Sequence, residues 1–300
     1  MGQLDGRVAV ITGAGSGLGR EHALLFAAEG GQVVVNDVKG AASVAEEIVA
    51  AGGQAIAVEG SVADMAVGER LTAAAVESFG DLHVVVNNAG VVRDAMVWNM
   101  TEEQFDLVLD VHLKGTFSVT RAAARYWRDR AKAGASVDRS IVNTTSAAGL
   151  HGNVGQWNYA AAKAGLAIQT VVGATEMGRF GVRVNAIAPM ARTDMLADSP
   201  AFLAAVAAPE DENAFDRYHP EQVSPLVGYL ASASCPFTGQ VFSTTGGHVG
   251  LYAGYSLGHV VNVDHAWTIA DLAEVMGDPT FPRSIEVSRQ RLIAAEGAGR

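Results

Sequence analysis

Three residues in the middle of the chain have the types and spacing of a proton-transfer site. Tyr159 and Lys163 lie four residues apart, so on a helix they share one face. A phenol with a pKa near ~10 is a poor base at neutral pH, but a nearby ammonium favours the phenolate. We therefore expect Tyr159 to act as a base, with Lys163 lowering its pKa and Ser146 hydrogen-bonding the same substrate oxygen. A Tyr–Lys pair also arises by chance on many helices.

A glycine-rich segment near the start of the chain could bind a pyrophosphate. It reads T-G-A-G-S-G-L-G from residue 12 to residue 19. Glycines allow the backbone to approach a phosphate closely, and the N-terminus of the following helix attracts negative charge. The usual fingerprint G-x-G-x-x-G fails at Leu18, and the spacing is G-x-x-x-G-x-G instead. A tight turn would need glycines for steric reasons alone. The expected cofactor-binding residues of this loop are Gly13, Ser16, Gly17, Leu18 and Gly19.

Asp37 ends the second expected strand, 18 residues after Gly19. A carboxylate at about 20 residues from the loop accepts hydrogen bonds from the adenosine ribose and repels a 2′-phosphate. The spacing therefore predicts NAD rather than NADP as the cofactor. Lys39 lies close enough in sequence to weaken this repulsion, and Asp37 could instead cap the loop before the next helix.

The elements that must position these residues are visible as an alternation along the chain. Short β-branched runs that fit buried strands alternate with Ala-rich amphipathic stretches that fit helices. This alternation predicts an α/β fold with a doubly wound parallel sheet, a Rossmann fold, in a single domain with a C-terminal extension. A capping box is expected to start a helix at residues 101–104. The expected strands are 8–12, 33–37, 55–58, 82–87, 140–144, 182–188 and 240–243, and the expected helices are 17–30, 41–52, 63–79, 101–133, 156–179 and 219–232.

Three motifs in order resemble those of the short-chain dehydrogenases/reductases. They are Thr12-Gly13-x-x-x-Gly17-x-Gly19, Asn87-Asn88-Ala89-Gly90 and Ser146-(x12)-Tyr159-(x3)-Lys163, and the resemblance covers about residues 5 to 247. It implies hydride transfer between a secondary alcohol and a nicotinamide cofactor, with Lys163 also reaching the nicotinamide ribose. The positive nicotinamide ring is expected to act together with Lys163 in lowering the pKa of Tyr159. It further implies that Asn88, Ala89 and Gly90 flank the adenosine side of the cofactor, and that Thr193 contacts its carboxamide.

The chain departs from the family's pattern at three places. His112 stands where an Asn is usual, whose backbone carbonyl holds a water of the proton relay. His112 could support that water or relay protons itself, or be an ordinary helix-interior histidine. Ser61 and Val62 follow the third strand, where an Asp often meets the adenine, so backbone groups or the Ser61 hydroxyl are left for that contact. Pro189, expected beside the cofactor, precedes Met190 where a Gly is common.

The substrate is indicated only by resemblance. Residues 149–159 resemble 3-oxoacyl thioester reductases and hydroxyacyl-CoA dehydrogenases, and residues 110–115 resemble the (3R)-hydroxyacyl-CoA dehydrogenase domain of peroxisomal multifunctional enzymes. This implies interconversion of a (3R)-3-hydroxyacyl-CoA and its 3-oxoacyl-CoA, with His151, Asn153 and Gln156 at the substrate. A hydroxysteroid dehydrogenase, a 3-oxoacyl-thioester reductase and a catalytically silent dinucleotide-binding sensor or scaffold are the alternatives.

Composition argues against several other classes of protein. The net charge of −11 and the lack of a basic run argue against nucleic-acid binding. Cys235 is the only cysteine, so no internal disulfide can form. No apolar run approaches the ~18 to 20 residues that span a bilayer, and no leader pattern is present, so a cytoplasmic protein without a membrane partner is expected. The histidines lack metal-site spacing, and no metal is expected.

Two segments do not fit the strand–helix alternation. Residues 190–218 are expected to form a substrate lid within a dehydrogenase domain at 1–247. Residues 248–300 form an extension rich in aromatics, including Tyr252, Tyr255 and Trp267, which would line the substrate mouth or pack on the body or a partner subunit. Residues 101–133 and 156–179 resemble the helices of the family's dimer interface, which implies a homodimer or homotetramer.

Overall fold

The computed structural model describes residues 2–193, 204–211, 214–254, 266 and 268–277. It divides into two compact units, residues 1–252 and 253–300. In the second unit, the helix α10 (Ile269–Gly277) begins where Thr268 and Asp271 exchange hydrogen bonds. Residues 194–203 of the expected lid and most of the tail, including Tyr255 and Trp267, lie outside the described residues.

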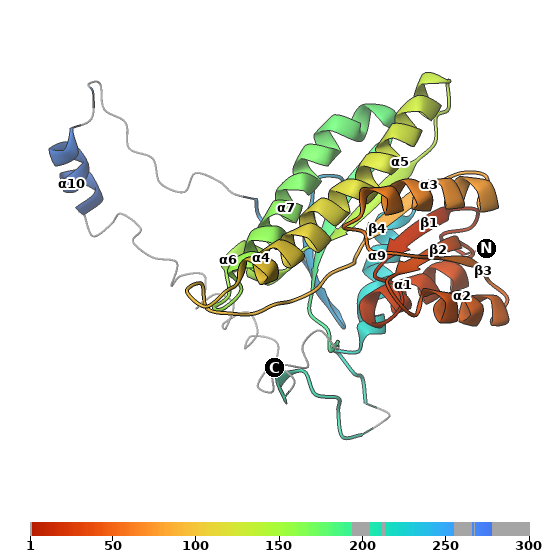
Figure 1. Ribbon diagram of the computed structural model, residues 1–300, viewed down its shortest axis with the longest axis horizontal. Helices are drawn as coiled ribbons and strands as arrows, with labels where there is room; N and C mark the ends of the chain where they lie inside the picture. The colour runs from red at the N-terminus through yellow and green to blue at the C-terminus, as the bar shows by residue number, and fades with distance from the viewer. Residues whose placement is uncertain (1, 194–203, 212–213, 255–265, 267, 278–300) are drawn as a thin grey trace. The chain divides into compact units, whose positions relative to one another are not determined.

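The first unit is built on one sheet, which in the described residues has eight strands in the order β3-β2-β1-β4-β5-β6-β7-β8. The chain winds outward in both directions from the boundary between β1 and β4, so the doubly wound Rossmann fold is confirmed (Figure 1). The first seven strands are parallel and the last is antiparallel. The strands are β1 (Val8–Thr12), β2 (Gln32–Asp37), β3 (Gln54–Glu59), β4 (Val84–Asn87), β5 (Arg139–Thr144), β6 (Val182–Pro189), β7 (Val241–Thr245) and β8 (His248–Leu251).

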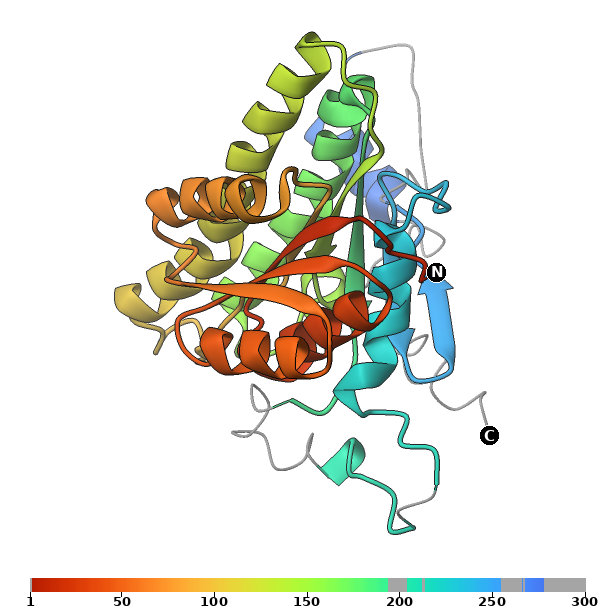
Figure 2. The same cartoon turned by 90° about the vertical axis from the view of Figure 1, so that its right-hand side faces the viewer.

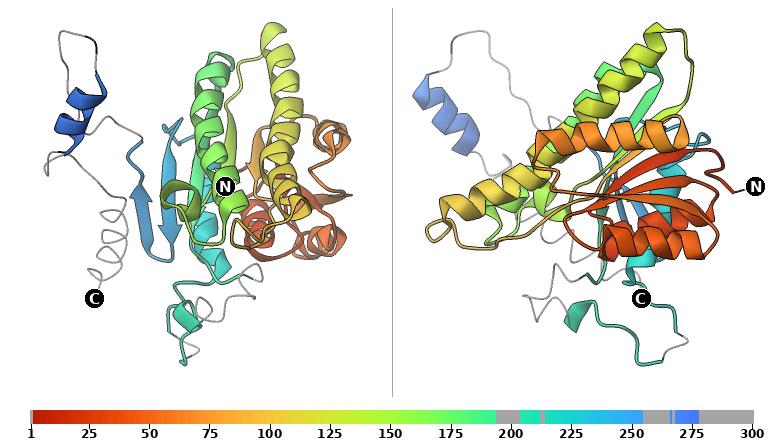
Figure 3. Two further views of the ribbon diagram at one scale, coloured as in Figure 1. Left: turned by 60° about the vertical axis from the view of Figure 1, so that its left-hand side comes forward. Right: turned by 45° about the vertical axis from the view of Figure 1, so that its right-hand side comes forward.

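Helices cover both faces of the sheet (Figures 2 and 3). One face packs against α1, α2 and α9, and the other against α3, α5 and α7. Because both faces are covered, every residue of β1, β4 and β5 is buried. Apolar residues predominate in β1 and β4, whereas β5 also carries the buried polar residues Arg139 and Asn143. The helices are α1 (Gly17–Ala28), α2 (Ala41–Ala50), α3 (Met65–Phe79), α4 (Glu102–Leu109), α5 (Gly115–Lys132), α6 (Ala147–His151), α7 (Trp157–Met177) and α9 (Ser224–Ala231).

The stretch expected as one helix at 101–133 is interrupted. The capping box at its start is confirmed, because Thr101 Oγ1 accepts from Gln104 N and Gln104 Oε1 accepts from Thr101 N. A π turn, η1 (Asp110–Lys114), then separates α4 from α5 and contains His112. Such π turns insert a residue into the helical ladder and are frequent at functional sites.

The sheet also extends beyond residue 247, where the sequence placed the end of the dehydrogenase domain. Thr245 pairs with His248, so Gly246 and Gly247 form a two-residue hairpin turn. Gly247 has φ +70°, a conformation that glycine adopts without strain. β8 therefore belongs to the body of the protein, and it leads to Tyr252, whose backbone N–H donates to Val241 O.

Candidate active site

Ser146, Tyr159 and Lys163 meet at the carboxyl end of the sheet. Ser146 follows β5 and begins α6, and its hydroxyl accepts from Ala148 N at 3.2 Å. Tyr159 lies in the first turn of α7, and the nearby Ser146 hydroxyl acts to lower the pKa of Tyr159. One turn further, Lys163 Nζ lies 5.4 Å from the centre of the Tyr159 ring. Lys163 is 3% exposed and donates to the Thr144 carbonyl at 2.5 Å. The fold therefore brings the expected proton-transfer residues together.

Burial is the largest influence on the acidity of this pair. It raises the pKa of Tyr159 to about 12, against the opposing hydrogen bond from Ser146. It lowers the pKa of Lys163 to about 7. The sequence predicted that Lys163 and the positive nicotinamide ring together lower the tyrosine pKa, whereas in the polypeptide alone burial raises it. Desolvation destabilises a buried phenolate and a buried ammonium alike, so each group favours its neutral form.

His112 packs directly against Tyr159. Its ring meets the Tyr159 ring edge to face at 5.2 Å between centroids. Its Nε2 lies 2.8 Å from Val91 O and 3.1 Å from Val91 N, while its buried Nδ1 has no hydrogen-bond partner among the described residues. Burial, with the nearby Lys163, lowers the pKa of His112 well below its usual value, so the ring is neutral. Gly90 is required here, because a Cβ would lie 2.4 Å from His112 Cε1.

The glycine loop has the shape of a phosphate cradle. A Cβ at Gly19 would lie 2.1 Å from Gly13 O, and a Cβ at Gly13 would lie 2.6 Å from Ala89 Cα. Gly17, by contrast, has φ +52°, and the one atom within 4 Å of its Cβ position is Thr193 Cγ2 at 3.9 Å. The loop is therefore closed toward the protein and open beside Gly17. The Ser16 hydroxyl begins α1 without capping it, so it is free to bind a phosphate oxygen.

Asn88 and Thr12 stabilise the glycine loop through hydrogen bonds. Asn88 Nδ2 donates to Thr12 O and Gly13 O at 3.1 and 3.2 Å. The backbone N–H groups of Asn88 and Ala89 both donate to Thr12 Oγ1. The Asn88 side chain thus holds the glycine loop in shape, and Thr12 has a structural role that the sequence did not reveal.

Asp37 contacts the same loop from the end of β2. Its Oδ2 accepts from Gly15 N at 3.0 Å, and its Oδ1 accepts from Val38 N at 2.7 Å. The carboxylate therefore binds the backbone of both the glycine loop and the residue that follows Asp37 in sequence, and each oxygen keeps a lone pair for a ribose hydroxyl. Ser61 is exposed and accepts from Ala63 N, whereas Val62 is 5% exposed and packs where Gly115 leaves room.

The expected substrate residues lie on the segment between α6 and α7. His151 ends α6, and its ring centre lies 5.6 Å from that of Tyr252. Asn153 Nδ2 donates to Gln156 Oε1 at 3.0 Å, and Gln156 Nε2 in turn donates to Asp94. Asp94, on the segment after β4, did not stand out in the sequence, because nothing local links it to Gln156.

Pro189 and Thr193 lie beyond the end of β6. Pro189 pairs with Thr244 in β7, and Thr193 reaches the glycine loop beside Gly17. Between them, Arg192 forms an ion pair with Asp216 and donates to Val206 O at 2.9 Å. The two ends of segment 190–218 are therefore joined.

Comparison with known proteins decides the family. The family model for short chain dehydrogenases matches residues 7–203, about two thirds of the chain. The chain belongs to this family. Its members are oxidoreductases that act on CH–OH groups with a nicotinamide dinucleotide, so this short-chain dehydrogenase is one too. The glycine loop, open beside Gly17, fits such a cofactor.

Particular relatives resemble this short-chain dehydrogenase over most of its length. It is 45% identical over 297 residues to the hydroxyacyl-CoA dehydrogenase ChsB1 of Mycobacterium tuberculosis, covering 95% of this chain and 92% of that protein. It is 39% identical to the peroxisomal multifunctional enzyme type 2 of Drosophila melanogaster, covering 81% of this chain but 39% of that longer protein. A solved short chain dehydrogenase from Mycobacterium avium matches with a TM-score of 0.83 at 48% identity, covering 92% and 95% of the two chains.

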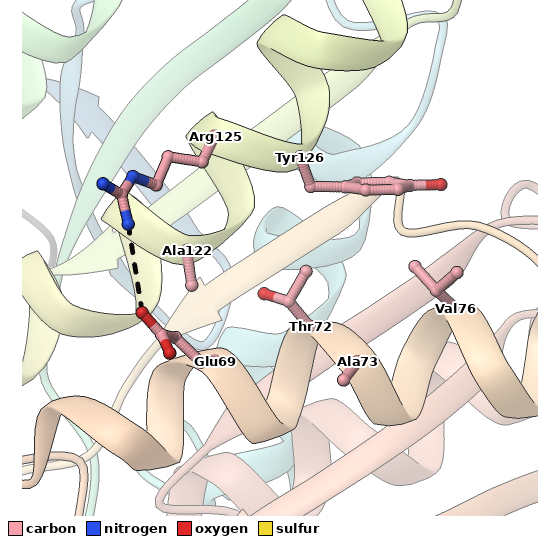
Figure 4. Close-up of a pocket in the computed structure, with 7 residues that line it drawn as sticks. All are labelled: Glu69, Thr72, Ala73, Val76, Ala122, Arg125 and Tyr126. Atoms are coloured by element: carbon pink, nitrogen blue, oxygen red, sulfur yellow. Dashed lines mark ion pairs between the residues drawn. The ribbon is translucent and has the colours of Figure 1, made fainter.

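Other kinds of site are not evident in this dehydrogenase. Among the described residues, no group of three or more His, Cys, Asp or Glu side chains could hold a metal. No described helix is long and apolar enough to cross a bilayer. A pocket of about 340 Å³ lies between α3 and α5, where Glu69 pairs with Arg125 beside Tyr126 (Figure 4). It is lined by none of the expected catalytic or cofactor residues, so it is separate from the active site.

Proposed function

We propose that this short-chain dehydrogenase interconverts a (3R)-3-hydroxyacyl-CoA and its 3-oxoacyl-CoA, with NAD as the cofactor. The observation that carries this proposal is the Ser146, Tyr159 and Lys163 cluster in a chain 45% identical, over almost its full length, to a hydroxyacyl-CoA dehydrogenase. The similarity to the peroxisomal multifunctional enzyme supports the same substrate class.

The residues of the cluster divide the proton chemistry between them. In oxidation, Tyr159 Oη takes the proton of the substrate hydroxyl, while Ser146 hydrogen-bonds the same oxygen and steadies its developing charge. The bound nicotinamide supplies the hydride acceptor. Lys163, when protonated, favours the phenolate through its charge. In reduction, Tyr159 returns the proton to the ketone oxygen, and its raised pKa keeps the phenol protonated at neutral pH.

The preference for NAD is supported by Asp37. A carboxylate at the end of β2 accepts from ribose hydroxyls and repels a 2′-phosphate. Binding of NAD and NADP to the wild type, followed by titration calorimetry, tests this. We expect tighter binding of NAD, and an Asp37→Ser variant that narrows the difference between the two cofactors. Tighter binding of NADP by the wild type would contradict the assignment.

The substrate class is tested by the change in nicotinamide fluorescence with a panel of alcohols. The panel contains (3R)- and (3S)-3-hydroxyacyl-CoAs of several chain lengths and hydroxysteroids. We expect the highest kcat/KM with a (3R)-hydroxyacyl-CoA. A higher value with a hydroxysteroid would assign the protein to that alternative, and cofactor binding without turnover of any alcohol would favour the sensor or scaffold.

A reductase acting on a carrier-bound thioester is the second candidate. The chain is 39% identical to the 3-oxoacyl-[acyl-carrier-protein] reductase of Synechocystis, covering 83% of this chain and 99% of that protein. The two candidate functions are distinguished by measuring the reduction of the same 3-oxoacyl group carried on CoA and on acyl carrier protein. A clear preference for the carrier protein would favour the reductase.

A homodimer or homotetramer is supported by apolar residues on the outer helices. Phe117 on α5 is 51% exposed, and Ile168 and Val172 on α7 are 49% and 48% exposed. Exposed apolar surface of this kind is typical of an interface between subunits. Light scattering of the purified protein should therefore give a mass of two or four times 31.1 kDa.

A further inference from the structure

We infer that Asp94 is a positioning residue that fixes the orientation of the Gln156 amide at the mouth of the active site. The inference deepens the proposed function, because it takes Gln156 as a residue that contacts the substrate. Asp94 itself is not placed at the reacting atoms. It acts through the side chain that it holds.

The hydrogen bonds around Gln156 are directional. Its Nε2 donates to both oxygens of Asp94, at 3.0 and 3.3 Å. Its Oε1 accepts from Asn153 Nδ2 at 3.0 Å. A carboxylate can accept hydrogen bonds but cannot donate them, so Asp94 selects the NH₂ end of the amide. The Gln156 oxygen is thereby turned toward Asn153.

The backbone around Asp94 ties the same two segments together. Ala95 N donates to Gly155 O at 2.9 Å, next to an isolated parallel bridge between Ala95 and Gln156. Asn158, which is fully buried, donates to Arg93 O at 3.0 Å, and its Oδ1 accepts from Tyr159 N at 2.7 Å. The segment after β4 is therefore attached to the first turn of α7, which carries the catalytic tyrosine.

Asp94 also affects the catalytic tyrosine through its charge. Three titratable groups face Tyr159 from the surrounding elements: Lys163 on α7, His112 on η1 and Asp94 on the segment after β4. The negative charge of Asp94 raises the pKa of Tyr159 further, after the larger effect of burial. This gives a second measurement, because a residue with only a packing role would leave the tyrosine's titration unchanged.

The Asp94→Asn substitution removes the preference for the NH₂ end of the Gln156 amide. The introduced amide would offer either an oxygen or an NH₂ group to Gln156, so the Gln156 amide could flip and present its opposite end to the substrate. Asp94→Ala removes the partner altogether. Asp94→Glu keeps an acceptor on a longer side chain and serves as the conservative rescue.

The experiment is a double-mutant cycle with Asp94→Ala, Gln156→Ala and the double variant. KM, kcat and the pH profile of kcat/KM are measured with the best secondary alcohol of the panel. Glu77→Gln, which removes an exposed carboxylate on α3, is the matched control for charge. If hydroxyacyl-CoAs are not turned over, the proposed function fails, and the cycle is still completed with whichever alcohol reacts.

We expect each single Ala variant to raise KM about 3- to 10-fold with kcat changed less, as for loss of one charge-assisted hydrogen bond. The double variant should be no worse than the poorer single variant. The pKa assigned to the tyrosine should fall in the Asp94→Ala variant but stay unchanged in Gln156→Ala and in the Glu77→Gln control. Asp94→Glu should restore most of the wild-type KM. Additive effects on KM, or an unchanged tyrosine pKa in Asp94→Ala, would overturn the inference.

Discussion

Burial shifts Tyr159 and Lys163 toward their neutral forms, and this shift affects which direction of the reaction the polypeptide favours. A phenol with a pKa of about 12 is protonated at neutral pH and can donate to a developing alkoxide, but it becomes a phenolate base only when a positive charge compensates its burial. Lys163, with a pKa of about 7, can supply that charge near and below neutral pH. As the pH rises through 7, Lys163 loses its positive charge, which disfavours the phenolate. The lower proton concentration favours alcohol oxidation, because that reaction releases a proton, so the two effects of pH oppose each other.

The strongest test at the residue scale is Tyr159→Phe. The change removes the hydroxyl that exchanges the proton and keeps the ring that packs against His112. We expect kcat/KM to fall by at least ~10³-fold, the upper range for acid–base catalysis. Steady-state kinetics measures the loss, and an unchanged melting temperature shows that the fold is intact. Near-normal turnover would refute the mechanism.

The His112→Asn variant tests whether residue 112 acts through its imidazole or through its backbone carbonyl. The backbone carbonyl of residue 112 is retained, while the polar contacts of the imidazole Nε2 with the backbone N–H and carbonyl of Val91 are lost. We expect kcat/KM to stay within about 10-fold of the wild type, well short of the loss in Tyr159→Phe. A loss as large as that of Tyr159→Phe would show that the imidazole itself transfers protons. Melting temperatures of both variants are measured alongside.

At the scale of elements, segment 190–218 is joined at its two ends. Arg192, just after β6, pairs with Asp216 through both of its terminal nitrogens, and its backbone N–H donates to Tyr218 O at 2.8 Å. The ion pair lowers the pKa of the Asp216 carboxyl. The ion pair connects the segment after β6, which reaches the glycine loop through Thr193, to the residues before α9.

Asp216→Asn should therefore affect binding more than chemistry. The change removes the charge of the pair and leaves the side chain's size nearly unchanged. We expect KM for cofactor or substrate to rise about 3- to 10-fold, as for a charge-assisted hydrogen bond, with kcat changed less. Steady-state kinetics for both substrates gives the split. A fall in kcat alone would contradict this role.

At the scale of the whole molecule, the candidate active-site residues and the ion pairs that join the strands lie at opposite ends of the sheet. The site residues follow the carboxyl ends of β1, β2 and β5, as is usual for open α/β sheets. The amino ends carry partly buried ion pairs instead. Arg139, 2% exposed at the start of β5, contacts Asp81 at 3.0 Å and donates to Leu82 O. Near it, Arg7 and Arg183 both pair with Asp138 at 3.0 and 2.9 Å.

The helix layer on one face contains a histidine that should make the fold sensitive to acid. His22 on α1 is fully buried and bonds Ser224 on α9 at 2.8 Å. Burial lowers the pKa of His22 to about 3, below its ordinary value of 6.5. The unfolded chain therefore binds more protons between these two pH values. Stability contributed by neutral His22 is complete above pH 6.5 and is lost as the pH falls toward 3.

His22→Asn should reduce this acid sensitivity. The wild type should lose up to ~1.4 kcal/mol of unfolding free energy per pH unit across that range from this residue, and the variant should lose that contribution. Urea unfolding at several pH values from about 7 to about 4 measures the slopes. Equal slopes for wild type and variant would mean that His22 titrates normally in the folded protein.

The sequence by itself determined the features that depend on local order. Periodicity identified β1 to β7 to within a few residues, because covered parallel strands are apolar on both faces, but it joined α4 to α5 and missed α6. The spacing of Tyr159 and Lys163 placed them on one helix face, and the capping box placed the start of α4. The hairpin at Gly246 and Gly247 was visible as a glycine pair but was not recognised as the turn into β8.

Tertiary structure alone decided the features that depend on contacts between distant segments. His112 meets Val91 across 21 residues, Gln156 meets Asp94 across 62, and His22 meets Ser224 across 202. No periodic pattern in the sequence reveals such pairs, because the partners are far apart along the chain and meet only when the chain folds. The acidity of Tyr159 belongs to the same group. A neighbouring lysine in the sequence suggested a lowered pKa, but burial is a property of packing, and it raises the pKa instead.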